Sequence, residues 1–440
     1  MRILSKKHSF EFLGNTEGSL MKKRIAMVLI CALAGTSMIA CGKKTEPINT
    51  DNTQATEQVQ PAEENKESDK DPVSTSAPDI SFASVKVEGY DYYVGEAQCL
   101  QITDDKHPEL KVAVDEYFDG VVKVFNTGVE EMNEQAKQQN DEMGDSENTI
   151  KYSENITIDI KRRDNKLLSF VLNDYTFMGG AHGGGSYTGV NFDVATGKQI
   201  TLDDLGDSEA IRQTSKQYIL DTIANSSEQA RGNLYSDDII DYKQVIEELF
   251  SNGNQPEFYL DTVGITFIFQ QYDIAPYAAG TISVTVPYSQ YEGINDRYTP
   301  LPDSNYAFQL SNAGIDSRID FNGDGQLDTI SVINTWDEEA DKNYVVLRVN
   351  GEDLKNETGN GSWYTGYFIH NDQGNFVLLA NDGISMDLYD VSKGIKAKSH
   401  MDTTLSVKEV TESGITLGEY TYNENNIVWS NEQQIGFDFK

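Results

Sequence analysis

The acidic segment at residues 320–328 has the residue types and the spacing of a metal-binding loop. Asp320, Asn322, Asp324 and Asp328 stand at positions 1, 3, 5 and 9 of this segment, and glycine stands at position 6. Oxygen ligands at these positions, with the backbone carbonyl of Gln326 at position 7, suit Ca²⁺ held in a tight loop. Position 12 is serine rather than glutamate, so the loop is not an EF-hand. The sequence predicts a Ca²⁺ site here; the alternative is an acidic turn that binds no metal.

A second candidate is the glycine-rich segment at residues 179–185, which holds five glycines and one histidine. Glycines allow a ligand to approach the backbone closely. The segment lacks the spacing and the following helix of a dinucleotide-binding loop, and we interpret it as a sheet crossover or a bulge. A lone histidine is more often a hydrogen-bond partner than a catalyst. We take Gly179, Gly180, His182 and, from a later aromatic segment, Tyr277 as candidate binding residues, and we assign no catalytic residue.

The elements that must position these residues follow from hydrophobic periodicity. Alternating or β-branched and aromatic residues predict one strand or a pair of strands at 84–94, and single strands at 155–161, 167–176, 186–194, 263–269 and 281–286. Apolar residues three and four apart predict helices at 108–143, 207–226 and 236–251. Asp207 and Ser236 are the expected N-caps of the last two helices. Strands in runs with helices set apart from them indicate an α+β fold, with an antiparallel sheet and segregated helices.

The C-terminal residues 300–440 follow a proline-containing boundary and have a mostly β pattern. Short strand-like runs lie at 343–349, 366–370, 375–380, 385–391, 404–411 and 427–429. Four aromatic residues could form a carbohydrate-stacking surface in this domain: Trp336, Trp363, Tyr364 and Trp429. Because aromatic side chains contribute most by being buried, we favour a role for them in the core.

The N-terminal 79 residues have the character of a targeting segment and a linker. Residues 21–40, a basic start followed by an apolar run, are typical of an export signal and are short for a membrane span. The preceding residues 1–20 are interpreted as an extension from a mis-assigned start. Residues 41–79 are polar and predict a disordered tether. The run that ends at Cys41 resembles a bacterial lipobox, which implies a lipid on Cys41 and a location on the outer face of the membrane of a Gram-positive bacterium.

The charge of the chain limits its partners. Residues 1–40 hold six of the 35 Lys and Arg residues and two of the 71 Asp and Glu residues, which leaves a net charge of −40 on residues 41–440. Such a charge argues against nucleic-acid binding, which needs basic patches. It suits divalent cations and basic proteins. Beyond Cys31 and Cys41 the chain has one cysteine, Cys99, so no internal disulfide framework is expected.

Three motifs resemble a known family. Residues 175–183 (YTFMGGAHG), 192–205 (FDVATGKQITLDDL) and 272–289 (YDIAPYAAG and VPYS) resemble the RsiV-like extracellular domain. Residues 80–176 are similar to the domain that precedes it in RsiV-type anti-sigma factors and in peptidoglycan deacetylases of the PdaC type. The loop at 320–328 resembles the calcium loops of integrin-type propeller repeats. The resemblance implies an accessory part at 80–176, an RsiV-like part at 177–295 and a β domain at 300–440.

The resemblance implies an extracellular sensing or binding module, which in RsiV-type proteins binds lysozyme. We therefore predict a lipid-anchored, non-enzymatic surface protein that binds a basic wall protein such as lysozyme, or peptidoglycan. The membrane is expected to be contacted through the lipid alone. The alternative is a wall-modifying hydrolase or deacetylase that uses His182 and the carboxylates Asp174 and Asp193. The deacetylase motif T-F-D-D-G-P is absent from the sequence, which favours binding over catalysis.

Overall fold

The computed structural model describes residues 76–440 apart from 145–148, 237, 300–304, 312, 338–339, 360–361 and 424–425. The predicted lipid site at Cys41, the export signal and the tether to residue 75 lie outside the described residues, as does the side chain of Trp429. In the described part, no helix is both long enough and apolar enough to cross a membrane.

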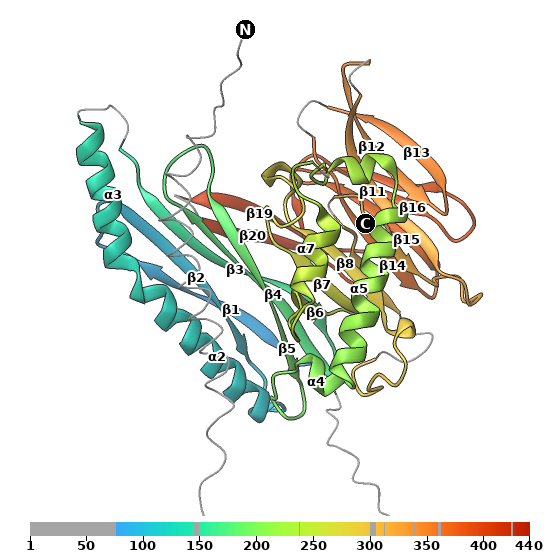
Figure 1. The fold of residues 1–440 in the computed structure, drawn as a ribbon, viewed down its shortest axis with the longest axis horizontal. Helices are drawn as coiled ribbons and strands as arrows, with labels where there is room; N and C mark the ends of the chain where they lie inside the picture. Colours follow the sequence, from blue (N-terminus) through green and yellow to red (C-terminus); the bar gives the residue numbers. More distant parts are fainter. Residues whose placement is uncertain are drawn as a thin grey trace, which may run out of the picture.

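The first unit is built around a five-stranded sheet in the order β1-β2-β3-β4-β5 (Figure 1). Its strands are β1 (Ile80–Val87), β2 (Tyr93–Ile102), β3 (Tyr152–Arg163), β4 (Leu167–Phe177) and β5 (Gly184–Asp193). Strands β2 and β3 are parallel and the other neighbours are antiparallel. A parallel pair needs a long crossover. The helices α2 (Pro108–Thr127) and α3 (Val129–Met143) supply it along one face of the sheet (Figure 1).

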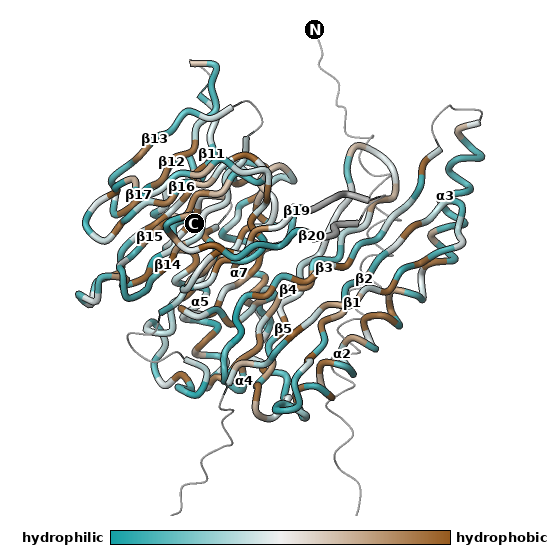
Figure 2. Tube along the Cα trace, turned by 180° about the vertical axis from the view of Figure 1, so that it is seen from behind, coloured by the Kyte–Doolittle hydropathy of each residue, from teal (hydrophilic) through white to brown (hydrophobic). Residues whose placement is uncertain are grey.

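The predicted helix at 108–143 is thus two helices separated at Gly128. Glycine has a low helix propensity, and it interrupts the helix although the apolar stripe continues across it to Val129 and Met132. The inner face of α2 is buried with Leu110, Val114, Phe118, Val121 and Phe125. Towards its end α3 becomes hydrophilic (Figure 2).

A three-stranded antiparallel sheet packs on the other face of the first sheet. It consists of β6 (Glu257–Leu260), β7 (Gly264–Phe269) and β8 (Ile282–Pro287), which includes the predicted hairpin. Its far face packs on α5 (Ser208–Asn225) and α7 (Tyr242–Leu249). The shorter helices α4 (Leu202–Leu205) and α6 (Glu228–Gly232) lie between β5 and α7 in the chain. The unit therefore has four layers: helices, sheet, sheet, helices.

The strand β6 lies very close to β5. A Cβ at Gly189 of β5 would stand 1.9 Å from the carbonyl oxygen of Phe258, so this position requires glycine. Two side chains of the first sheet serve as backbone partners of β6: Ser169 Oγ and Asn191 Oδ1 both accept from the Leu260 N–H, at 3.2 and 2.7 Å. The two sheets are joined by polar contacts as well as by apolar packing.

Helix starts were predicted with mixed success. Asp207 caps α5 and accepts from the N–H groups of Glu209 and Ala210. Ser236 does not cap α7, which begins at Tyr242 and is capped by Asp241. Asp238 and Ile239 form a turn instead, and Ile239 is exposed rather than part of an apolar helical face.

The C-terminal unit is a stack of three sheets and confirms a mostly β region. The first sheet is β10 (Ser317–Ile319), β11 (Asp328–Asp337), β12 (Lys342–Val349) and β13 (Glu352–Thr358). The central sheet is β9 (Tyr306–Gln309), β14 (Thr365–Asn371), β15 (Gly374–Asn381), β16 (Ser385–Asp390) and β17 (Lys396–Asp402). The third is β18 (Ser406–Val410), β19 (Ile415–Asn423) and β20 (Asn426–Ile435). Alternate residues of β15 face two different cores, Val377 and Leu379 on one side, Phe376 and Leu378 on the other.

Candidate functional site

The glycine-rich segment is the loop of the β4–β5 hairpin. The register between the strands runs without interruption to Thr176↔Gly184, so our interpretation as a crossover or a bulge is wrong. Gly179 and Gly180 have φ values of +84° and +95°. Residues other than glycine rarely adopt this backbone conformation, so glycine at both positions allows the tight turn of the hairpin. The loop presents His182 to solvent.

His182 stacks on Tyr277, a residue 95 positions later in the chain. The ring centroids are 3.8 Å apart and the planes are inclined by 15°. Tyr277 belongs to the short 3-10 helix η1 (Tyr277–Ala279) between β7 and β8. The structure therefore brings together the candidate binding residues of two distant segments, His182 with Gly179 and Gly180 on one side and Tyr277 on the other.

Hydrogen bonds fix the orientation of the imidazole. His182 Nδ1 lies 2.8 Å from the carbonyl oxygen of Gly183, and Nε2 lies 3.3 Å from the hydroxyl of Tyr272. A carbonyl oxygen can only accept, so Nδ1 carries a proton. In the neutral ring, Nε2 then accepts from the Tyr272 hydroxyl.

The side chain of Tyr175 and the backbone of Tyr187 hold the segments that carry this stack. The Tyr175 hydroxyl accepts from the Gly183 N–H at 3.0 Å and shares a hydrogen bond with Tyr277. Burial first, and then the neighbouring Tyr175, raise the pKa of Tyr277 above its ordinary value. The Gln270 side chain pairs with both backbone groups of Tyr187, at 2.9 and 2.8 Å, and so fastens β5 to the end of β7.

Tyr272 is held in an uncommon backbone conformation, with φ at +71°. A non-glycine residue pays a conformational penalty there. The conformation leaves the side chain 48% exposed, beside His182. We call the four rings of Tyr175, His182, Tyr272 and Tyr277 the aromatic platform. Pro276 and Ala278, which flank Tyr277, are also exposed.

The aromatic platform contains no carboxylate, and the two considered for catalysis lie elsewhere. Asp174 precedes Tyr175 on β4, and successive strand residues point to opposite faces of a sheet. Because Val171 contacts β6 and β7 while Leu172 packs towards α2, Asp174 points to the helix side and Tyr175 to the platform side. The structure does not bring Asp174 to His182.

Asp193 lies at the opposite end of β5 and is fully buried. Its Oδ2 accepts from Arg297 Nε at 2.7 Å and from the Tyr298 hydroxyl at 3.0 Å. Burial acts to raise the pKa of Asp193, but hydrogen bonds from Arg297 and Thr196 outweigh it and hold the pKa below its ordinary value. Asp193 therefore has a structural role, remote from His182.

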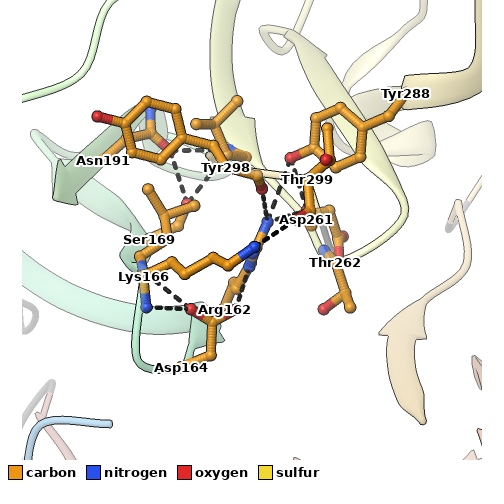
Figure 3. A network of polar contacts seen from close by, with 12 residues as sticks. Arg162, Asp164, Lys166, Ser169, Asn191, Asp261, Thr262, Tyr288, Tyr298 and Thr299 are labelled. Carbon is orange, nitrogen blue, oxygen red and sulfur yellow. Dashed lines mark hydrogen bonds and ion pairs between the residues drawn. The ribbon is translucent and has the colours of Figure 1, made fainter. Parts of the chain in front are cut away.

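A buried polar cluster centred on Arg162, which the sequence did not indicate, lies between the two sheets (Figure 3). Arg162 is 4% exposed. Its Nη1 donates to the carbonyl oxygens of Tyr298 at 2.6 Å and Asp261 at 3.3 Å, and its Nε pairs with Asp164 at 2.6 Å. Close by, Lys166 donates to the carbonyl oxygen of Thr299. The cluster fastens the segment after β8 to the β3–β4 turn.

A β-bulge makes this cluster possible. The register of β3 shifts between Ile160 and Arg162. Without the shift both would face α2, where Ile160 does lie. One extra residue turns the following side chain to the other face, and Arg162 thus pairs with Ser169 and points between the sheets. The sequence carried no clear signal of the bulge.

Asp261 is the carboxylate at the centre of this interface, and it is 2% exposed. Burial raises its pKa to about 6, although the Thr262 N–H, Lys161 and Arg162 act in the opposite direction. The Thr262 N–H donates to Oδ1 at 2.6 Å. Burial disfavours the charged form of this carboxyl. Asp261 therefore affects the stability of the fold and takes no part in chemistry at the surface.

The predicted Ca²⁺ loop connects β10 to β11. Its side chains wrap their own backbone: Asp320 accepts from the N–H groups of Gly323, Asp324 and Gly325 at 2.8–3.1 Å. The carboxylate of Asp328 accepts hydrogen bonds from the Phe321 N–H and from the side-chain amides of Asn322 and Asn350. Among the described residues, no three His, Cys, Asp or Glu side chains are gathered to hold a metal ion. In this arrangement the loop is folded but its acidic groups do not converge, and Ca²⁺ binding stays a prediction.

The predicted core role is wrong for two of the four aromatic residues of the C-terminal unit. Trp336 is 46% exposed and Trp363 is 47% exposed, while Tyr364 is half-buried against the core. Trp429 cannot be placed, because its side chain lies outside the described residues. Local sequence does not tell a buried from an exposed tryptophan at the end of a strand.

The fold and the site define an α+β unit with an exposed aromatic surface, followed by a layered β unit. Residues 86–184 match the family model described as deacetylase PdaC, and residues 204–289 match that of a protein of unknown function, DUF3298. The prediction of a PdaC-type part is confirmed by this match. The RsiV-like and propeller-type resemblances stay predictions.

Solved structures of two DUF3298 family proteins are similar to this chain. One, from Bacteroides fragilis, is 22% identical with a TM-score of 0.37 and covers 49% of this chain and 94% of its own. The other, from Pseudomonas aeruginosa, is 16% identical with a TM-score of 0.32 and covers 53% of this chain and 99% of its own. No curated protein matches the chain.

Proposed function

We propose that this chain is a non-catalytic binding protein of the cell wall and that the aromatic platform contacts the glycan of peptidoglycan. The observation that carries the proposal is the exposed stack of His182 on Tyr277, with Tyr272 hydrogen-bonded beside it. Flat aromatic rings with polar tips provide apolar contact together with hydrogen bonds. A sugar ring offers the matching combination, an apolar face and a rim of hydroxyl groups.

The platform is arranged before any ligand binds. Tyr175 and Gly183 hold the loop of His182, while the hydrogen bond with Tyr272 fixes its ring. Rigid tyrosines offer a large contact area at a small entropic cost. Three of the four rings of the platform are tyrosines, which are uncharged near neutral pH. A neutral ligand suits these rings.

A second candidate partner is a basic wall protein such as lysozyme. The observation that favours it is the net charge of −40 on residues 41–440, which attracts a cationic protein over long distances. Such an interaction would weaken steeply with salt, because exposed charges are screened within about 10 Å at 0.1 M salt. Glycan stacking on the platform would change little over the same range.

The test is sedimentation of the protein with purified, insoluble peptidoglycan at low and high salt. We expect binding that survives high salt and falls at least threefold in Tyr272→Ala and Tyr277→Ala. The matched control is Phe82→Ala, which removes an exposed ring from the edge strand β1. Equal binding by all four proteins would reject the platform, and binding to lysozyme alone, lost at high salt, would favour the second partner.

Catalysis by His182 is tested in the same samples. Release of acetate or of soluble sugar from peptidoglycan is measured for the wild type and for His182→Ala. The proposal expects equal background rates, because no carboxylate belongs to the platform. A rate that depends on His182 would replace the binding function by the enzymatic alternative.

We further propose that the protein acts at the outer face of the membrane through a lipid on Cys41. Acyl chains hold a protein by about 0.8 kcal/mol per buried CH₂, so two or more chains give stable attachment. Metabolic labelling with a fatty acid should mark the wild type and not Cys41→Ala. Equal labelling of both would exclude this anchor.

A further inference from the structure

The strongest unexplained surface lies on the C-terminal unit, away from both matched segments. The chain has three tryptophans, and two of them, Trp336 and Trp363, are nearly half exposed. Tryptophan is usually well buried. Neither residue is required by the proposed function of the platform.

Trp336 stands on the inner side of the sheet, at the point where the core ends. Along β11 the inward-facing positions are Val332, Asn334 and Trp336. Val332 belongs to the buried core, together with Leu347 of β12, its partner in the register. Two positions further, Trp336 is paired with Asn343, and Asn343 with Thr358 of β13. The core-facing surface thus continues past the core as an open row of Trp336, Asn343 and Thr358.

Hydrogen bonds hold the surroundings of this row in place. The Asn334 side chain binds the carbonyl oxygen and the N–H of Tyr364, both at 2.9 Å, and so fastens the segment that carries Trp363 to β11. Asn356 Nδ2 donates to the Tyr389 hydroxyl at 2.9 Å and links β13 to β16 of the central sheet. The open end of the two sheets is therefore rigid, as a preorganised binding site must be.

The charged residues beside this row lie on the opposite face of the sheet. Lys355 pairs with Asp337, and Lys342 pairs with Glu357. The Lys355 ammonium also lies 3.7 Å from the ring centroid of Tyr344, on that same outer face. Each of these charges has an opposite partner, while the inner row of Trp336, Asn343 and Thr358 carries none. A basic peptide would gain little from this row.

We propose that the open end of the C-terminal β unit is a second binding site, for a neutral carbohydrate chain. Indole rings of Trp336 and Trp363 stack on the apolar faces of sugars, and the amide of Asn343 and the hydroxyl of Thr358 bond to sugar hydroxyls. Sites for small ligands combine aromatic walls with a few placed polar groups in this way. The site lies outside residues 86–289 and does not depend on the platform.

Tryptophan fluorescence tests the site directly, because the platform contains tyrosine and histidine but no tryptophan. The full chain is titrated with neutral N-acetylglucosamine oligomers. We expect a saturable change in tryptophan emission, insensitive to salt, with affinity about tenfold weaker in Trp336→Ala and partly restored in Trp336→Tyr. Tyr344→Ala, on the outer face of the same sheet, should bind like the wild type.

Thermal melting of each variant shows that it is folded, and Asn343→Ala provides a second, milder variant that should weaken binding without changing the fluorophores. Absence of any saturable change in emission, or equal affinity in the wild type, Trp336→Ala and Asn343→Ala, would overturn the proposal. A response to polylysine in place of the oligomers would assign the surface to a basic peptide instead. Loss of peptidoglycan binding in Tyr272→Ala with an unchanged fluorescence titration would separate the two sites.

Discussion

Two clusters join the same pair of sheets at opposite ends of β4, and they differ in what their groups contact. At one end Arg162 is buried and is bonded to protein groups (Figure 3). At the other end His182 and Tyr272 are exposed; the His182 ring stacks on Tyr277, and the Tyr272 ring lies tilted beside both. Strand β4 has 11 residues and is about 35 Å long at roughly 3.3 Å per residue, and the two clusters lie towards its opposite ends.

The two clusters differ in whether their polar and aromatic groups are free to contact a ligand. The groups around Arg162 form hydrogen bonds that hold the β3–β4 turn, β6 and the segment 296–299 together. Substitutions there should therefore change the stability of the fold. The platform is rigid but leaves ring faces and hydroxyl groups open to solvent, so substitutions there should change binding more than stability. The predictions below test this division, beginning with the largest expected effect.

Removing the Arg162 guanidinium should destabilise the first unit most. Arg162→Met removes the donor of the buried Tyr298 carbonyl oxygen and leaves the Asp261 carbonyl oxygen with the Tyr288 hydroxyl, and breaking a buried charged cluster costs about 3–5 kcal/mol. Urea unfolding measures the loss. The control Arg163→Met alters the exposed neighbouring residue and should change the free energy of unfolding by about 0.5 kcal/mol or less. Equal losses in both variants would contradict a buried role.

Asp261 should make the protein less stable as the pH rises. Its pKa is about 6 in the folded protein and about 3.9 in an unfolded chain, so the folded state binds more protons between these values. The free energy of unfolding therefore falls between about pH 4 and pH 6, by at most about 3 kcal/mol. Asp261→Asn should remove this fall and be the more stable protein at pH 8. An unchanged pH profile in Asp261→Asn would show that the carboxyl is not responsible.

The acidic loop at 320–328 is a third polar cluster, and Ca²⁺ shows whether its carboxylates can bind a ligand or only their own backbone. If it binds Ca²⁺ as the sequence predicts, with a Kd of about 10⁻⁴–10⁻³ M as in extracellular modules, 1 mM Ca²⁺ adds about 0.4–1.4 kcal/mol of stability. Thermal melting with Ca²⁺ and with EDTA measures it, and Asp324→Ala should lose the difference. Identical melting in both solutions would leave the loop as an acidic turn that only binds its own backbone.

Tyr272 should show the smallest effect on stability and a clear one on binding. Glycine accepts a φ of +71° without penalty, so Tyr272→Gly should raise stability by up to about 1 kcal/mol while weakening peptidoglycan binding. Asn252→Gly changes another residue of positive φ, far from the platform in sequence, and should leave binding unchanged. A loss of stability in Tyr272→Gly would mean that its ring holds the structure together.

Much of the element pattern could be predicted from local sequence. The hairpin of β7 and β8, the strands β3 to β5 and the short strands of the C-terminal unit follow from alternation and turn residues. The predicted helix start at Ser236 was wrong because Asp241, five residues later, is the cap that the backbone uses. The interruption at Gly128 was missed because the apolar stripe continues across it.

The candidate site was predicted only as separate residues. Gly179, Gly180, His182 and Tyr277 were chosen one by one, and nothing in their spacing indicates that His182 and Tyr277 stack. Tyr272, which orients the imidazole, and Arg162, which depends on a bulge, were not found at all. A one-residue shift in register turns a side chain to the other face of a sheet, and that shift depends on the partner strand.

The fold class, the acidic charge and the kind of residues available to each segment follow from the sequence, because periodicity and composition are local properties. Which of these residues meet, which carboxylates take part in buried contacts and which tryptophans stay exposed depend on the folded chain. The reason is that burial and stacking depend on segments distant in the chain. His182 and Tyr277 are 95 residues apart, and packing of the two sheets makes them neighbours.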